Sequence, residues 1–151
     1  VGSEMCIRDS VYTIRGQFLE SEYPEITLFD GRFDTGFKIL DFVVASGDPT
    51  DATEDCHAKL GTRKMTASGW NFADVSQIAW AVSENRVTNS PVFGRSIVDP
   101  DNLVVENLWL RGNTSGDAPI NYMITMQKYE FDEWNGALAM VRNKAQGTES
   151  T

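Results

Sequence analysis

Reactive and metal-binding side chains are scarce in this sequence of 151 residues, which has two cysteines and one histidine. Two cysteines cannot staple a disulfide-rich scaffold, and a structural zinc site would need four ligands. Long apolar runs are absent as well, and none approaches the ~18–20 residues of a membrane-spanning helix. Basic residues are outnumbered 13 to 22 by acidic ones, giving a net charge of -9. This balance argues against binding to nucleic acid, which depends on clustered Lys and Arg.

What remains is an ordinary globular composition, with 41% hydrophobic and 23% charged residues, in a chain whose length fits a single core. Residues 1–10 read VGSEMCIRDS, which has neither strand nor helix periodicity. This string closely resembles the translated sequencing-adapter peptide that recurs at the ends of metagenomic reading frames. We therefore expect a non-native or disordered tail at 1–10, one β-sandwich domain at 11–144 and a disordered polar tail at 145–151.

From residue 11 onward the dominant pattern is the alternation of apolar and polar residues, interrupted by turn residues every ~8–12 positions. Near the C-terminus the period changes to that of a helix, with Trp134, Ala137, Leu138 and Val141 on one face. The pattern predicts a mainly β fold, an antiparallel sandwich resembling a jelly roll, with one short helix over about 132–143. We expect strands at 11–14, 25–29, 37–45, 56–65, 78–82, 92–98, 103–110 and 120–131.

Two of these strands carry expectations about their surroundings. The strand at 37–45 is apolar on both faces, so we expect it to be covered on both sides. One face carries Leu40, Phe42 and Val44, and the other carries Phe37, Ile39 and Val43. The strand at 56–65 is weakly apolar and contains three cations that would discourage edge pairing, so we expect it at a sheet edge. These cations are Lys59, Arg63 and Lys64.

Cys56 and His57 are the first residues to consider for catalysis, because a cysteine nucleophile needs a nearby histidine base. Adjacent residues of a strand point to opposite faces, so the two side chains would not converge. We interpret them as structural residues. Asp30 and Asp34 could form a glycosidase pair, but turn chemistry explains them equally well. We therefore expect no catalytic residue and no enzymatic activity.

Acidic residues gather in the loop at 46–55 and are the main candidates for a metal site. Calcium takes 6–8 oxygen ligands, which Asp48, Asp51, Glu54 and Asp55 could help to supply. Their spacing is irregular and lacks the string D-x-D-x-D-G, so a solvated loop is the main interpretation and no cofactor is expected. Asp99 and Asp101 flank a proline and are interpreted as turn formers rather than metal ligands.

Four tryptophans could act as stacking platforms for sugar rings: Trp70, Trp80, Trp109 and Trp134. Trp80 and Trp109 lie on expected strands among apolar neighbours, which favours packing in the core. Trp134 would anchor the C-terminal helix. Trp70 follows a Ser-Gly pair in an expected loop and precedes an asparagine, which makes it the best candidate for an exposed aromatic platform.

Between residues 26 and 140 the chain resembles small structural proteins of marine tailed phages. The resemblance is carried by four segments of strand and turn residues, ITLFDGRFDTGFKILDF, QIAWAV, DPDNLVVENLWL and INYMITMQKYEFDEWNGALAMVRN. It implies a virion component (capsid-associated, decoration, tail or baseplate) that packs against copies of itself or other virion proteins. From the charge balance and the lack of long apolar runs we expect contact with neither nucleic acid nor membrane. The alternative is a secreted or cell-surface module that binds carbohydrate through Trp70.

Overall fold

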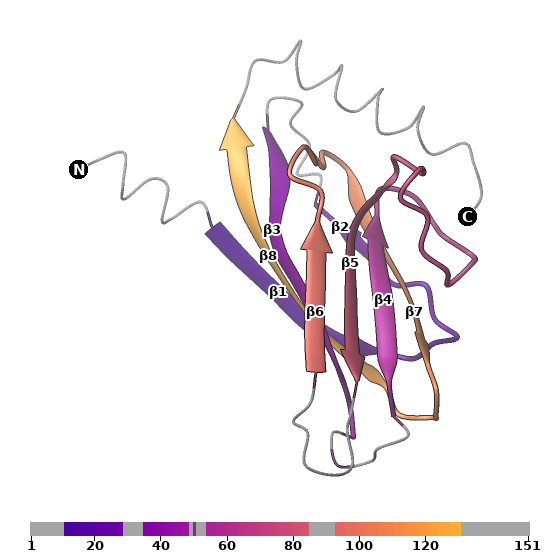
Figure 1. The fold of residues 1–151 in the computed structure, drawn as a ribbon. Coiled ribbons are helices and arrows are strands. Elements are labelled where there is room, and N and C mark those ends of the chain that lie inside the picture. Colours follow the sequence, from indigo (N-terminus) through magenta and orange to yellow (C-terminus); the bar gives the residue numbers. More distant parts are fainter. Residues whose placement is uncertain (1–10, 29–34, 49, 51–53, 85–92, 131–151) are drawn as a thin grey trace.

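The computed structural model describes residues 11–28, 35–48, 50, 54–84 and 93–130, and within these ranges the chain forms eight β-strands and no helix (Figure 1). No helix that could cross a membrane is therefore found in the described ranges. The strands are β1 (Val11–Phe18), β2 (Glu25–Thr27), β3 (Thr35–Ser46), β4 (Cys56–Gly61), β5 (Gln77–Glu84), β6 (Phe93–Val98), β7 (Asn107–Thr114) and β8 (Ile120–Glu130).

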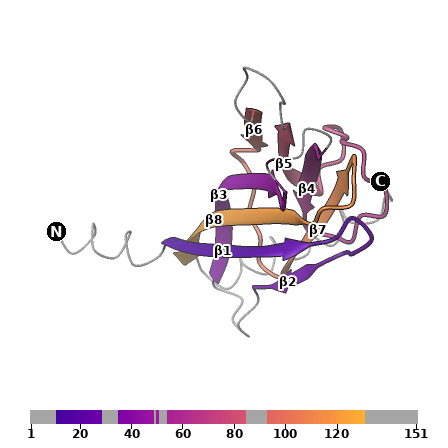
Figure 2. The ribbon, with the colours of Figure 1, turned by 90° about the horizontal axis from the view of Figure 1, so that it is seen from below.

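The strands form two antiparallel sheets that pack face to face. One sheet has three strands in the order β1-β8-β3, and the other has five in the order β2-β7-β4-β5-β6. Strands of the two sheets cross, since Figure 2 shows β1 and β8 side-on while β4, β5 and β6 are seen nearly end-on. The predicted mainly β, antiparallel sandwich is confirmed. The predicted helix at 132–143 and the two predicted tails lie outside the described residues.

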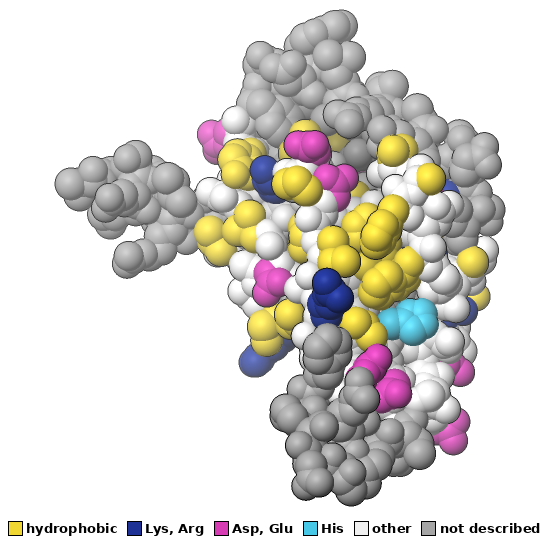
Figure 3. All heavy atoms as spheres, in the orientation of Figure 1, with side chains coloured by type: hydrophobic (Ala, Val, Ile, Leu, Met, Phe, Trp, Pro, Cys, Tyr) yellow, Lys and Arg dark blue, Asp and Glu magenta, His cyan; other side chains and the backbone are white. Residues whose placement is uncertain are grey.

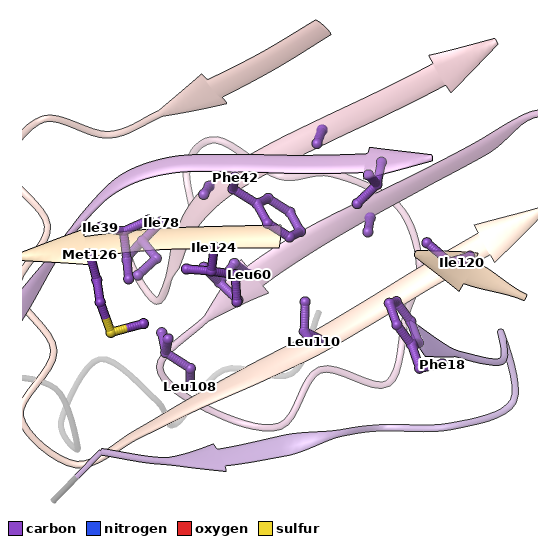
Figure 4. Packing of buried hydrophobic residues seen from close by; sticks show 14 of the residues in the cluster. Phe18, Ile39, Phe42, Leu60, Ile78, Leu108, Leu110, Ile120, Ile124 and Met126 are labelled. Atoms are coloured by element: carbon purple, nitrogen blue, oxygen red, sulfur yellow. The ribbon is translucent and has the colours of Figure 1, made fainter. Parts of the chain in front are cut away.

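The hydrophobic core lies between the two sheets and is built from strand alternation. On β8, the residues Ile120, Ile124 and Met126 are buried, as the alternating pattern of this strand predicts. Figure 4 shows Phe42 and Ile124 from the three-stranded sheet pointing toward Leu60 of the opposite sheet. Burial of this apolar surface is the main force that stabilises the sandwich.

The expectation that both faces of β3 are covered is wrong, because β3 contains a bulge. Its register with β8 shifts between Ile39 and Asp41, so the alternation changes phase there. Ile39 and Phe42 both face the core, whereas Val43 is 41% exposed and Leu40 is exposed too. Asn102 stabilises the bulge, since its Oδ1 accepts from the Ile39 N–H at 2.7 Å and its Nδ2 donates to the Ile39 carbonyl at 3.0 Å.

The expectation that residues 56–65 form an edge strand is also wrong. β4 lies inside the five-stranded sheet, paired with β7 on one side and β5 on the other. Lys59, which was expected to guard an edge, is fully buried. Lys59 is buried because the chain after β4 folds back over the outer face of the sheet and covers this side chain.

β7 begins later than expected and continues into residues that were expected to form a loop. Gly112 explains why the strand can pass this point. A Cβ atom there would lie 2.7 Å from Cδ1 of Ile120 and 2.9 Å from the carbonyl oxygen of His57. The glycine is therefore required by close packing inside the sandwich, although in the sequence it has the composition of a turn.

Candidate binding surface

Aromatic side chains gather on the outer face of the five-stranded sheet. Strand alternation sends Ala58 into the core, so its neighbours His57 and Lys59 point outward. Their partners on β5 are Val82 and Trp80. Figure 3 faces this surface and shows an apolar group beside the single histidine. A sheet face exposed to water normally carries polar side chains, so the aromatic side chains on this outer face require a further explanation.

Residues 62–76, which connect β4 to β5, lie over this face and are held by polar contacts. Nζ of Lys59 donates to the carbonyl of Gly69 at 2.5 Å. Oε1 of the buried Gln77 accepts from the Asn71 N–H at 3.0 Å. Both contacts tie the middle of the connection to side chains that rise from the sheet beneath it.

The base of the same connection is fixed by an ion pair. Arg63 and Asp74 approach to 2.9 Å, and both side chains are largely buried. Asp74 also accepts hydrogen bonds from the N–H and the hydroxyl of Ser76 at 3.0 and 2.7 Å. An ion pair with further hydrogen bonds to the same carboxylate holds its geometry better than an isolated surface pair. The connection is therefore anchored at its base as well as in its middle.

Trp70, Phe72 and Trp80 form what we call the aromatic shelf. The Phe72 ring meets the Trp80 ring edge-on with centroids 4.5 Å apart, and Nε1 of Trp80 donates to Gln77 at 3.0 Å. The Trp70 ring lies at 22° to that of Phe72, with centroids 6.5 Å apart. Trp70 is 37% and Phe72 63% exposed, against 6% for Trp80. Trp80 thus lies beneath Phe72, and Trp70 packs beside Phe72 at the surface.

Lys59 is a buried cation next to the shelf. Burial lowers the pKa of its ammonium group, and although the nearby Asp74 raises that pKa, Arg111 and Arg63 lower it further. A buried ammonium must find hydrogen-bond acceptors, which explains its short contact to the carbonyl of Gly69. The position of the 62–76 connection and the burial of Lys59 therefore depend on each other.

A groove of about 250 Å³ is lined in part by His57, whose ring also contacts Trp70 of the shelf. The two rings contact edge-on, with centroids 6.0 Å apart. Burial lowers the pKa of His57, and Lys59 and Arg111 add to this effect, which favours the neutral form of the ring. Its Nδ1 is buried without a hydrogen-bond partner in the described part of the chain. The groove is lined by Asp55, Cys56, His57, Val82, Glu84, Asn113, Thr114 and Ser115.

Cys56 and His57 point to opposite faces of β4 and cannot act as a nucleophile and base. The Cys56 side chain belongs to the core, whereas His57 contacts the shelf. Burial, together with the neighbouring Asp55 and Glu54, raises the pKa of the Cys56 thiol to about 11. A thiol with this pKa is protonated at neutral pH and is a poor nucleophile.

Glu54, one of the four calcium candidates, holds a turn of the backbone. Its carboxylate accepts from the N–H groups of Asp117 and Ala118 at 3.0 and 3.2 Å. Gly116 makes this possible, because a Cβ there would lie 2.0 Å from Oε1 of Glu54. The buried carboxylate thus joins the start of β4 to the turn between β7 and β8.

The other calcium candidates are placed as follows. Asp48 accepts from the hydroxyl of Thr50 at 2.8 Å, the Asp55 backbone pairs with Ser115, and Asp51 lies outside the described residues. In the described ranges no three Asp, Glu, His or Cys side chains come together as a metal site would require. A solvated loop without a cofactor stays the prediction, with calcium as its weaker alternative.

Two further pairs of aspartates were candidates for function in the sequence. Asp99 accepts from the Asp101 N–H at 3.0 Å, as expected for a turn. The glycosidase candidates Asp30 and Asp34 lie outside the described residues, as does Trp134. Trp109 is half-buried on β7, paired with Gly61 of β4 on the side of the sheet away from the core.

Trp70, the best platform candidate in the sequence, lies at the surface, but sequence reasoning missed Phe72. The signal was present as two aromatic residues two positions apart, in a stretch of Ser, Gly, Asn and Asp without strand periodicity. No model of a known protein family matches the chain, and no curated protein matches its sequence.

Proposed function

We propose that this chain is a non-enzymatic structural component of a virion that works by packing against copies of itself or against other virion proteins. The aromatic shelf carries this proposal, because exposed groups of large apolar side chains mark protein contact sites. Aromatic residues are enriched in such contacts and supply much of their binding energy. The assignment to a virion, as a capsid-associated, decoration, tail or baseplate protein, rests on the resemblance to phage structural proteins.

The strand order supports a jelly roll, an architecture found in viral capsid and lectin domains. A chain wound into a jelly roll brings together its first and eighth, second and seventh, third and sixth, and fourth and fifth strands. Here β1 pairs with β8, β2 with β7 and β4 with β5. β3 lies beside β6, and the hydroxyl of Ser96 donates to Asp41 at 3.5 Å. The departure from the ideal pattern is that β6 is hydrogen-bonded to β5.

The shelf is suited to binding because it is held in place before any partner arrives. Side chains that must become ordered on binding reduce affinity, whereas anchored ones do not. The contacts of Lys59 with Gly69 and of Gln77 with Asn71 hold the connection that carries Trp70 and Phe72. A partner surface could therefore cover two aromatic rings at a small cost in entropy.

The test is the mass of the purified chain by light scattering over a series of concentrations. We expect discrete oligomers that do not change when polysaccharides are added. Phe72→Ser should reduce the mass, whereas Met123→Ser, which removes an exposed apolar side chain from the outer face of the other sheet, should leave it unchanged. Equal masses for the wild type and Phe72→Ser would contradict the proposal.

A second candidate function is carbohydrate binding by a secreted or cell-surface protein. The nearly parallel rings of Trp70 and Phe72 favour it, because sugar rings stack on exposed aromatic faces. The groove lined by His57 would place Asn113 and Glu84 where they could form hydrogen bonds with sugar hydroxyls.

Tryptophan fluorescence separates the two candidates. Carbohydrate binding predicts that a polysaccharide quenches the emission of a monomeric protein, and that Trp70→Ala removes the response while Trp109→Phe retains it. A monomer whose emission responds in this way would favour the second candidate. A monomer without any response would contradict both.

A further inference from the structure

β1 presents an open sheet edge. Its eight residues pair with β8 in an unbroken antiparallel register from Val11 to Phe18. In the strand order β1-β8-β3, its other side pairs with no strand of the described ranges. The free N–H and C=O groups of an edge strand are a template for a further strand.

The other edges of the two sheets are less suited to pairing. β2 is three residues long and β6 is six. β3 is interrupted by its bulge near Leu40 and lies against β6. β1 is longer than β2 and β6, has no proline and no bulge, and carries one charged residue, Arg15. It therefore lacks most of the devices that natural proteins use to block an edge.

An apolar groove of about 400 Å³ lies between β1 and β2, directly beside this edge. Tyr12 is half-exposed and forms part of the wall of this groove. Its ring meets that of Phe37 edge-on, with the ring centroids 6.2 Å apart. The groove is lined by Tyr12, Thr13, Ile14, Thr27, Leu28, Phe37, Met126 and Lys128. A strand added next to β1 would place every second side chain beside Tyr12 and Ile14, which line the groove from β1, as in other cases of strand addition.

We propose that β1 pairs antiparallel with β1 of a second copy of this chain, about a twofold axis at Ile14. The two three-stranded sheets would then join into one sheet of six strands. In this register Ile14 lies opposite its own counterpart, Thr13 opposite Arg15, and Val11 opposite Gln17. Such a contact is self-complementary, as a symmetric dimer requires.

The charge of Arg15 and the length of strand that is paired together select this register among those that keep the apolar side chains on the groove side. A register centred on Arg15 would oppose two guanidinium groups, which is unfavourable. A register centred on Thr13 would pair only the part of β1 from Val11 to Arg15. The register centred on Ile14 pairs Val11 through Gln17 and places each guanidinium opposite a hydroxyl group.

A charge-exchange experiment tests the pairing. It uses the full chain with Phe72→Ser as background, so that any contact through the aromatic shelf is removed. We expect a dimer in sedimentation equilibrium. Adding Thr13→Lys places a lysine opposite Arg15 twice in each dimer and should raise the dissociation constant about tenfold. Adding Arg15→Glu to that variant converts both repulsive pairs into attractive ones and should restore the dimer.

Thr125→Lys is the matched control, because Thr125 lies opposite Thr13 on the same face but on the middle strand β8. It should leave the dimer unchanged. A monomer at every concentration would overturn the proposal, as would a dimer that Thr13→Lys does not weaken or that Arg15→Glu does not restore. These outcomes are independent of the shelf, whose failure would appear as equal masses for the wild type and Phe72→Ser.

Discussion

The two outer faces of the sandwich are built differently. On the three-stranded sheet, the outward residues of β1 and β8 are mostly hydroxyl and amide side chains, such as Thr13, Gln17 and Asn121. Gln17 donates to Asn121 at 2.8 Å; Gln17 is exposed to solvent and Asn121 is half-buried. On the five-stranded sheet, the 62–76 connection forms a third layer that covers Lys59 and Trp80.

This difference supports the proposal that the aromatic shelf is a contact surface. Both sheets bury their inner faces in the same core, so neither needs a covered outer face for stability. The third layer requires the burial of a lysine and of a glutamine, which costs free energy unless their polar atoms are paired. A layer that buries polar groups in order to hold Trp70 and Phe72 at the surface is expected where those rings make contacts.

The largest effect on stability is expected for a substitution in the core that lies between the two sheets. Phe42 is fully buried at the centre of the core, whereas its neighbour Val43 stands on the outer face of β3. Phe42→Ala should lower the free energy of unfolding by about 3–5 kcal/mol. Val43→Ala should change it by about 0.5 kcal/mol or less. Urea unfolding of both variants checks this. Similar losses of stability for the two variants would contradict the position of the bulge, which turns Val43 outward.

A smaller effect on stability should distinguish the two outer faces when one glutamine on each of them is replaced by alanine. Gln77→Ala leaves the Asn71 N–H and the Trp80 indole without their acceptor and should cost about 1–3 kcal/mol. It should also expose the 62–76 connection to protease. Gln127→Ala removes one exposed hydrogen bond to Tyr129 on the other sheet and should cost about 0.5 kcal/mol or less. Equal protease resistance of the two variants would argue against an anchored third layer.

The smallest effect concerns pH. Because burial lowers the pKa of His57 below its ordinary value of 6.5, the unfolded chain takes up a proton at this residue before the folded one does. The stability linked to His57 is therefore complete above pH 6.5 and is lost as the pH falls from 6.5 toward the lowered pKa. His57→Gln should reduce the slope of stability against pH in that range. Unfolding at several pH values checks this, and an unchanged slope would mean that His57 is not buried beside the shelf.

Much of the fold could be predicted from the sequence, because alternation reports directly which side chains face a core. The inward set on β8 illustrates this. The bulge in β3 could not be predicted, since Leu40 and Val43 are as apolar as their buried neighbours. The central position of β4 could not be predicted, because a lysine in a weakly apolar strand is typical of a sheet edge. The burial of Lys59 depends on a chain segment that folds back over it.

The candidate binding surface was predictable only in part. Trp70 could be identified because a large aromatic residue in a Gly- and Ser-containing loop has no strand partner to bury it. Phe72 and the anchoring role of Gln77 could not, because both depend on where the 62–76 connection lies relative to Trp80. Contacts between a loop and a strand leave no periodic pattern in a sequence.

Hydroxyl-radical footprinting tests most directly whether the shelf face is the contact surface, because it probes both outer faces in one molecule. The labelling rates of Trp70, Phe72 and Met123 would be compared between concentrated, assembled protein and dilute protein. We predict that Trp70 and Phe72 become protected on assembly while Met123 is labelled at the same rate. Unchanged labelling of both shelf residues, or protection of Met123 alone, would contradict the account.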